Sequence, residues 1–143
     1  MKPNEVMANE FAKKYNGKIT GIIHGNKILK SGEKSRAGYK VEIDGLLVHT
    51  YLIKTWHNNK KAISINTEQL EEAVGDNALI LMSYNGIEYV CHSTMWESDA
   101  KSSGNYDVHT RFGTQEVFQD RGRFRVLDLD KYELSRYGYG DTN

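Results

Sequence analysis

Apolar side chains near the start of the chain follow the period of a helix. In residues 4–17 they recur at spacings of one and four, which places them on one helical face. These side chains are Val6, Met7, Phe11 and Tyr15. Asn4 can cap the first turn, and Gly17 is typical of the left-handed residue that ends a helix. The pattern therefore predicts an N-terminal helix with one buried face.

The pattern then changes to the alternation of strands, which is clearest in residues 39–54. Asp44 and Gly45 separate two apolar runs there. This dipeptide suits a type I′ hairpin turn, in which both central residues have positive φ. The second run, residues 46–54, is largely apolar on both faces. Since such a strand is usually covered on both sides, we expect it to be central in a sheet.

Two segments before this hairpin are less regular. Residues 18–32 contain β-branched runs interrupted at His24-Gly25-Asn26, which predicts a hairpin or a bent pair of strands. Residues 31–38 are polar, basic and flanked by glycine, so they are predicted to form a loop.

The second half is predicted to contain a helix, a hairpin and two further strands. Residues 62–65 have a short strand pattern, and a helix follows that is capped by Asn66 or Thr67 and ends at Gly75. Asn-Gly at positions 85–86 marks a second hairpin. The remaining segments are an irregular or briefly helical stretch, two strands about an Asp-Arg-Gly turn, and a last helical turn, at 94–107, 114–129 and 130–137.

Together these elements predict an α+β fold. The expected architecture is a mixed, largely antiparallel β-sheet, with an N-terminal helix and one short central helix against one of its faces. The length of 143 residues suits a single domain, to which we assign residues 1–137. Residues 138–143 are expected to form a flexible C-terminal tail.

The composition favours a cytoplasmic protein that does not enter a membrane. The sequence lacks the apolar run of about 18 residues that a membrane helix needs. Its opening, MKPNEVMANEF, lacks the apolar region of a secretory signal. Cys91 is the only cysteine, so no intramolecular disulfide can form, which fits a reducing compartment.

The net charge is zero, but the charges are unevenly distributed. Residues 1–61 hold twelve Lys or Arg and five Asp or Glu, a net charge of +7, and residues 62–143 carry the opposite charge, −7. Such asymmetry is typical of a protein with a polar partner, or of a dipolar molecule that associates with itself as a homodimer. The alternative is that folding mixes the two halves and leaves no patch.

The basic N-terminal part favours nucleic acid, and DNA in particular, as the partner. Its cations, Lys27 among them, can neutralise phosphates, and Tyr39 and Trp56 can stack on unpaired bases. The candidate nucleic-acid-binding residues are Lys13, Lys14, Lys18, Lys30, Lys34, Arg36, Lys40, Trp56, Lys60 and Lys61. The alternative interpretation is a solvated positive face with no ligand.

Residues 39–92 combine their predicted elements in a distinctive order. It runs strand, turn, strand ending in apolar-x-Lys at Lys54, basic loop, short strand, capped helix and strand. The segment YLIKTWHNNKKAISINTEQLEEA, residues 51–73, carries most of this order. It resembles the core of the restriction-endonuclease-like nucleases, above all the archaeal-type Holliday-junction resolvases. The resemblance implies a nuclease-like fold and DNA, branched DNA included, as the partner.

The resemblance also implies a catalytic site. In such nucleases carboxylates converge on Mg²⁺ and a lysine orients the attacking water. Carried onto this sequence, the acids would be Glu10, Glu42 and Asp44. Glu42 and Asp44 would hold the metal, and Lys54 would be the lysine. The family's carboxylate two residues before that lysine is replaced here by Leu52. The chain has therefore either lost this chemistry or replaced the acid with Glu42 or Asp44.

Several of these residues also have ordinary structural explanations. Lys54 can be a strand-end lysine that reaches water, and Asp44 is accounted for by its turn. No two of the five histidines have the i, i+4 spacing of a helical zinc site. Cys91 is best explained as a buried strand residue.

The sequence favours two functions over a third, a small-molecule-binding domain. The first is a nucleic-acid-binding protein with a nuclease-like core, either inactive or a Mg²⁺-dependent nuclease. The second is a small non-catalytic inhibitor or adaptor that docks on a larger protein. The contact candidates of the second are Tyr132, Tyr137 and Tyr139, since tyrosine is enriched in interface cores.

Overall fold

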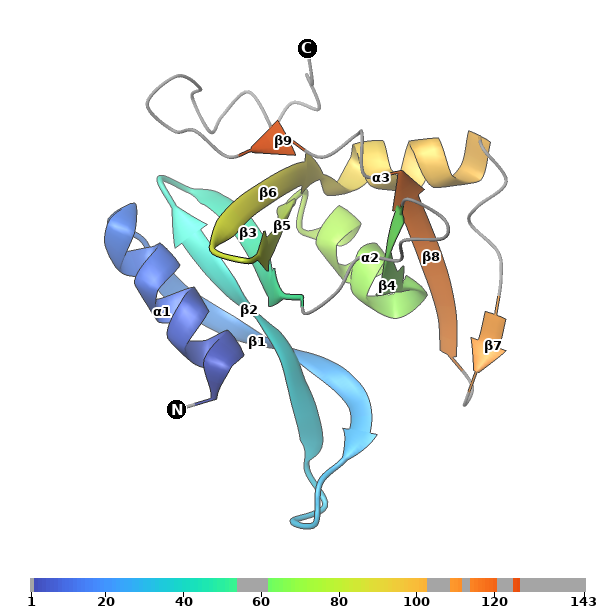
Figure 1. Ribbon diagram of the computed structural model, residues 1–143, viewed down its shortest axis with the longest axis horizontal. Coiled ribbons are helices and arrows are strands. Elements are labelled where there is room, and N and C mark those ends of the chain that lie inside the picture. Colours follow the sequence, from blue (N-terminus) through green and yellow to red (C-terminus); the bar gives the residue numbers. More distant parts are fainter. Residues whose placement is uncertain (1, 54–61, 103–108, 112–113, 121–124, 127–143) are drawn as a thin grey trace.

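The computed structural model of the chain describes residues 2–53, 62–102, 109–111, 114–120 and 125–126. They form three layers. Helix α1 (Pro3–Lys14) covers one face of a six-stranded sheet, and α2 (Thr67–Gly75) and α3 (Ser93–Ser102) cover the other (Figure 1). The α+β class and the mixed, largely antiparallel sheet are confirmed. The expectation that the helices share one face is wrong, because the central strands are apolar on both faces and each face needs a cover.

The six-stranded sheet has the order β1-β2-β3-β5-β6-β9. Its strands are β1 (Lys18–Ile28), β2 (Lys34–Ile43), β3 (Leu46–Leu52), β5 (Leu79–Tyr84), β6 (Ile87–His92) and β9 (Arg125–Val126). All neighbours pair antiparallel except β3 and β5, which are parallel. Parallel neighbours need a crossover connection, and the described part of this one contains β4 (Ala62–Asn66) and α2. As expected, β3 is a central strand.

A second, three-stranded sheet lies beside α2 and α3. Its order is β4-β8-β7, with β7 (His109–Arg111) and β8 (Thr114–Asp120) each pairing antiparallel with its neighbour. The sequence predicted that two strands of segment 114–129 meet about an Asp-Arg-Gly turn. Strands β8 and β9 do occur there, but they belong to different sheets (Figure 1), so they do not form a hairpin. The predicted helical turn and tail, 130–143, lie outside the described residues.

Both predicted two-residue turns have the backbone conformation that their sequences require. Asp44 and Gly45 have φ of 50° and 82°, and Asn85 and Gly86 have φ of 51° and 77°. Two consecutive positive values are the requirement of a type I′ turn. Asp44 is exposed at this turn, so turn geometry alone accounts for its residue type.

The ends of α1 differ from the prediction at both positions. Lys2, not Asn4, is the N-cap residue, and its side chain makes no capping hydrogen bond. At the other end, the left-handed residue is Asn16, with φ of 56°, and Gly17 has no positive φ. Gly17 is needed for space instead. A Cβ there would lie 2.6 Å from the Glu42 carbonyl oxygen and 2.7 Å from Ile43 Cγ1.

The other two helices follow simple local rules. The side chain of Asn66 accepts a hydrogen bond of 2.8 Å from the Glu68 backbone N–H and caps α2, as one of the two predicted caps. The stretch predicted as irregular or briefly helical begins with the ten-residue helix α3. Its buried residues Trp96 and Ala100 are spaced i, i+4, so they share one face.

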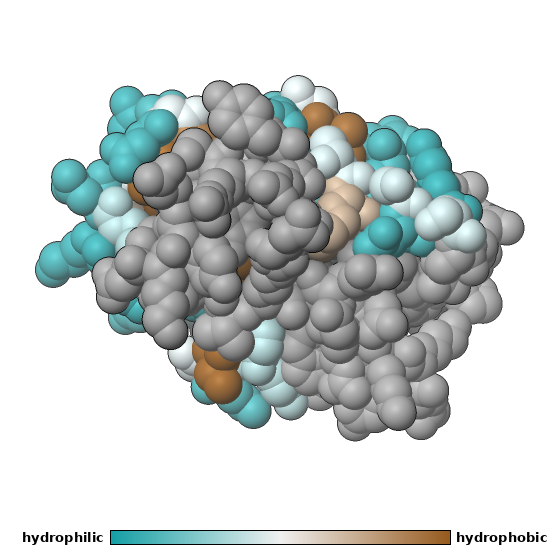
Figure 2. Space-filling view, turned by 90° about the horizontal axis from the view of Figure 1, so that it is seen from above, coloured by the Kyte–Doolittle hydropathy of each residue, from teal (hydrophilic) through white to brown (hydrophobic). Residues whose placement is uncertain are grey.

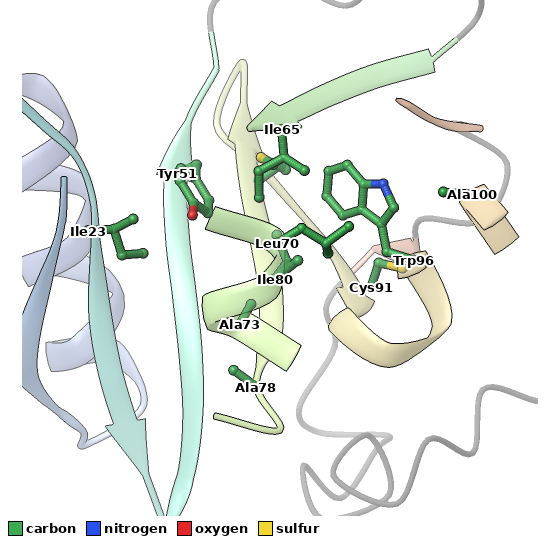
Figure 3. Packing of buried hydrophobic residues seen from close by; sticks show 11 residues of the cluster. Ile23, Tyr51, Ile65, Leu70, Ala73, Ala78, Ile80, Cys91, Trp96 and Ala100 are labelled. Atoms are coloured by element: carbon green, nitrogen blue, oxygen red, sulfur yellow. The ribbon is translucent and has the colours of Figure 1, made fainter. Parts of the chain in front are cut away.

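The two faces of the six-stranded sheet bury separate apolar clusters. Side chains on one face pack against α1 at Phe11 and Ala12. On the other face, Trp96 lies among side chains from α2 and the strands, including Leu70 and Ile65 (Figure 3). Cys91 belongs to this second cluster and is buried with a free thiol, which confirms its predicted role as a core residue.

On the face of the molecule seen in Figure 2, hydrophilic colour predominates among the described residues. In the view of Figure 2, hydrophobic colour is confined to small, separate areas of that surface. The large hydrophobic side chains that are exposed are Val6, Ile28 and Ile87. Within the described part of the chain, no helix has both the length and the apolar character needed to cross a bilayer.

Candidate functional site

Strands β1 and β2 extend beyond the sheet as a two-stranded ribbon. Strand β2 pairs with β3 only from Tyr39 to Ile43, whereas its pairing with β1 continues to Lys34, opposite Ile28. Residues 24–36, called the ribbon below, therefore project from the body of the protein, with the β1–β2 turn at the tip (Figure 1). Residues 34–38, predicted as part of a loop, belong to β2, and the predicted pair of strands at 18–32 is the single strand β1.

The ribbon bends where the sequence predicted a break. The pairing register shifts on both sides of His24, and such irregularities bend a strand and increase its twist. The base of the ribbon is held from both faces of the sheet. The Asn4 side-chain amide of α1 donates to the Arg36 carbonyl at 2.9 Å, and the Gln69 side-chain amide of α2 donates to the His24 carbonyl at 3.0 Å. The ribbon is thus anchored at a fixed place.

Positive charge is concentrated on the ribbon. Its exposed cations are Lys27, Lys30, Lys34 and Arg36, and its one acid is Glu33. Ile28, near the tip, is 59% exposed. The Arg36 guanidinium is hydrogen-bonded to Tyr39, which raises the pKa of Arg36. As an arginine it is charged at physiological pH in any case.

The other predicted basic residues do not join this surface. Lys13 and Lys14 end α1, and Lys18 begins β1. Lys18 and Lys27 are nine residues apart on one strand, which corresponds to about 30 Å. The exposed members of the predicted basic set that the structure describes thus form two groups at opposite ends of β1 rather than one continuous patch. The predicted contacts Trp56, Lys60 and Lys61 lie outside the described residues, as does Lys54.

Lys40 is engaged inside the protein. Its Nζ lies 2.6 Å from Glu72 Oε2 and 2.9 Å from Asp76 Oδ2, and its side chain is 20% exposed. Burial alone would lower the pKa of Lys40, but the hydrogen bonds to Glu72 and Asp76 outweigh it, so the pKa is raised. Lys40 is therefore a charged residue neutralised by two acids of the later half, and it is a poor candidate for a phosphate contact.

The same carboxylate also contacts a buried histidine. His49 lies opposite Lys40 in the β2–β3 hairpin, is fully buried, and places Nε2 2.8 Å from Asp76 Oδ2. Burial lowers the pKa of His49 although Asp76 acts in the opposite direction. The ring is therefore neutral, and Nε2–H donates to the ionised Asp76. Burial alone would raise the pKa of Asp76, but the hydrogen bonds from Lys40 and His49 lower it.

This group of ionisable residues, Lys40, His49, Glu72 and Asp76, fixes the end of α2 to the β2–β3 hairpin. Nearby Tyr51 is 6% exposed, and burial and the Glu72 carboxylate raise the pKa of its hydroxyl. His49 Nδ1 and Tyr51 Oη are buried without a hydrogen-bond partner among the described residues. Because His49 is fully buried, we interpret the group as structural rather than catalytic.

The structure does not bring the three predicted catalytic acids together on one face of the sheet. Glu10 is exposed on α1, which covers the sheet face that carries Val41 and Ile43. Glu42 lies between these two residues on β2, so it points to the opposite face. Asp44 is in the exposed turn. No group of three or more Asp, Glu, His or Cys suited to a metal occurs among the described residues.

Sequence comparisons do not assign the chain to a known family. No family model matches the sequence, and a search of curated proteins finds no match.

The sequence contains a signal for the ionisable group Lys40, His49, Glu72 and Asp76, which was not predicted. The Asp-Gly turn sets the hairpin register, so it already places Lys40 opposite His49. Glu72 and Asp76 are spaced i, i+4, which puts both acids on one side of the end of α2. The length of the ribbon had no comparable signal, because its second strand is polar and was predicted as a loop.

Proposed function

We propose that this protein binds nucleic acid through the ribbon. The observation that carries the proposal is local charge. Four exposed cations and one acid lie on a structure that projects from the body of the protein. Because the net charge of the chain is zero, the chain as a whole does not attract a polyanion. The local positive charge of the ribbon would supply the attraction. Phosphate contacts by Lys and Arg release counterions and supply most sequence-independent binding.

The proposal concerns binding and not hydrolysis. The structure contains β2, β3, β4, α2 and β5 in that order, an order that does not by itself define a nuclease fold. Of the implied acids, Glu10 and Glu42 lie on opposite faces of the sheet, and Asp44 lies in the exposed β2–β3 turn. Binding through the ribbon needs none of them. Mg²⁺ chemistry is therefore no part of the proposed function.

The test removes equal charge from the two ends of β1. One variant carries Lys27→Gln, Lys30→Gln and Lys34→Gln in the ribbon, and the matched control carries Lys13→Gln, Lys14→Gln and Lys18→Gln. All six side chains are exposed, so both variants are expected to fold, which circular dichroism checks. Binding of a labelled DNA duplex is measured by fluorescence anisotropy at several salt concentrations.

We expect the ribbon variant to lose at least about tenfold in affinity and the control less than about threefold. For the wild type, log K should fall with log salt concentration with a slope of about −3 to −4, which corresponds to the number of ribbon cations. Equal losses in the two variants would contradict the ribbon as the site. Absence of binding to any nucleic acid would overturn the proposal and favour the docking protein.

A further inference from the structure

Resting on the proposed function, we infer that the ribbon enters the major groove of B-form duplex DNA. The first argument is shape. The major groove is about 12 Å wide and about 8.5 Å deep, and it admits a two-stranded β-ribbon. Two paired strands are about 4.8 Å apart, which leaves room for side chains on both sides.

The second argument is reach. Strand β2 continues for five residues from Tyr39, its last residue paired with β3, to Lys34. Five residues of strand span about 16 Å, and the turn adds to that length. The projection exceeds the depth of the groove, so the tip can reach the base edges before the body of the protein meets the phosphate backbone. The anchors at Asn4 and Gln69 hold the base of the ribbon during such contact.

The third argument is the chemistry of the ribbon side chains. Residues 24–36 include no Phe, Tyr or Trp, and Tyr39 at the base is 3% exposed. Proteins that bind single strands rely on aromatic side chains on which bases stack. The ribbon instead offers cations for phosphates and, at its tip, the exposed Ile28, an apolar side chain suited to the thymine methyl group in the major groove.

These features also distinguish DNA from RNA. The major groove of an A-form RNA duplex is deep and too narrow for protein side chains to read. A ribbon that needs groove entry should therefore bind a DNA duplex in preference to the RNA duplex of the same sequence. Contacts to phosphates alone would make no such distinction.

The experiment compares four probes of matched length with the full chain. They are a DNA duplex, the RNA duplex of the same sequence, the single DNA strand, and a DNA duplex whose pyrimidines carry a bulky C5 substituent that fills the major groove. A small molecule that occupies the minor groove of the plain duplex serves as the control. Affinities are measured by fluorescence anisotropy at one salt concentration.

We expect at least about tenfold weaker binding to the RNA duplex, to the single strand and to the groove-filled duplex, and no change with the minor-groove ligand. Equal affinity for all four probes would overturn groove entry while the proposed nucleic-acid binding stands. Preference for the single strand would also overturn groove entry. Absence of binding to every probe would overturn both groove entry and the proposed nucleic-acid binding.

Discussion

His49 Nε2 and Asp76 Oδ2 are joined by a hydrogen bond of 2.8 Å, although the two residues are 27 positions apart. One comes from the centre of the sheet and the other from the residue after α2. Lys40 shares the same carboxylate oxygen at 2.9 Å. Burial lowers the pKa of His49 and keeps the ring neutral, although the bond to Asp76 acts in the opposite direction. This has a measurable consequence for stability.

The free energy of unfolding should fall as the pH drops below about 6.5, the pKa of an unfolded histidine. Burial lowers the pKa of both His49 and His92 in the folded state. Between the folded and the unfolded pKa, the unfolded chain binds protons that the folded chain does not, so acid favours unfolding. Each such histidine contributes up to about 1.4 kcal/mol per pH unit. Urea unfolding at several pH values between 5 and 8 measures the effect.

The variant His49→Gln isolates the contribution of this residue. Its amide can still donate to Asp76 but does not titrate, so its stability should depend less steeply on pH than that of the wild type. Glu88, whose pKa is raised by burial, titrates in both proteins, and its contribution cancels in the difference. Identical pH dependence in the two proteins would show that His49 is not held neutral.

Two glycine substitutions should have opposite signs. Gly17→Ala places a Cβ 2.6 Å from the Glu42 carbonyl oxygen. Because this oxygen belongs to the backbone of β2, it cannot easily move away, and the substitution should destabilise the protein by about 2–3 kcal/mol. Gly75→Ala at the end of α2 meets no atom within 4 Å and should stabilise it by about 0.5 kcal/mol. Chemical denaturation of both variants gives the values. A stable Gly17→Ala protein would refute the close approach.

The N-termini of α1 and α2 offer a matched pair of capping variants. Asn66→Ala removes the cap of α2 and should cost about 1 kcal/mol. Lys2 occupies an extended N-cap conformation without a capping hydrogen bond, so Lys2→Asp should add about 0.5–1 kcal/mol by supplying one. Thermal unfolding followed by circular dichroism compares both with the wild type. Loss of stability in Lys2→Asp would show that α1 does not begin at Pro3.

Incubation of DNA duplex and branched DNA with the protein and Mg²⁺ should leave both substrates intact. The reason is geometric, since Glu10 lies over one face of the sheet and Glu42 points to the other. A denaturing gel resolves any product. Mg²⁺-dependent cleavage that Lys54→Ala abolishes, and that Lys13→Ala leaves unchanged, would contradict this expectation and restore the nuclease interpretation.

Much of the fold was predictable because local rules determine it. Asp-Gly and Asn-Gly require positive φ and so located two hairpins. The capping residues Asn66 and Thr67 located the start of α2 to within one residue, and the apolar pattern of residues 46–54 located a central strand. Strand partners were less accessible, because alternation gives the face of a side chain but not its neighbour. That is why β8 and β9 were assigned to one hairpin and lie in different sheets.

The candidate site was predictable only in part. The sequence showed a basic N-terminal part but treated its cations as one set. The structure separates them, since a strand of eleven residues carries Lys18 and Lys27 to opposite ends. It also engages Lys40 with Glu72 and Asp76, because crossover helix α2 brings acids from the later half onto the hairpin. Such long-range pairing has no signature in a single sequence.

The parallel seam between β3 and β5 has a consequence for the kinetics of folding. Val48 pairs with Leu79, 31 residues later, whereas the hairpins on either side close over two-residue turns. Hairpins form within about 1–10 μs, but a seam of this kind must first close a long loop, which is slow. During synthesis, the strands up to β3 can pair as soon as they leave the ribosome. Until β5 is synthesised, β3 lacks its parallel partner and remains an unpaired edge strand with apolar side chains.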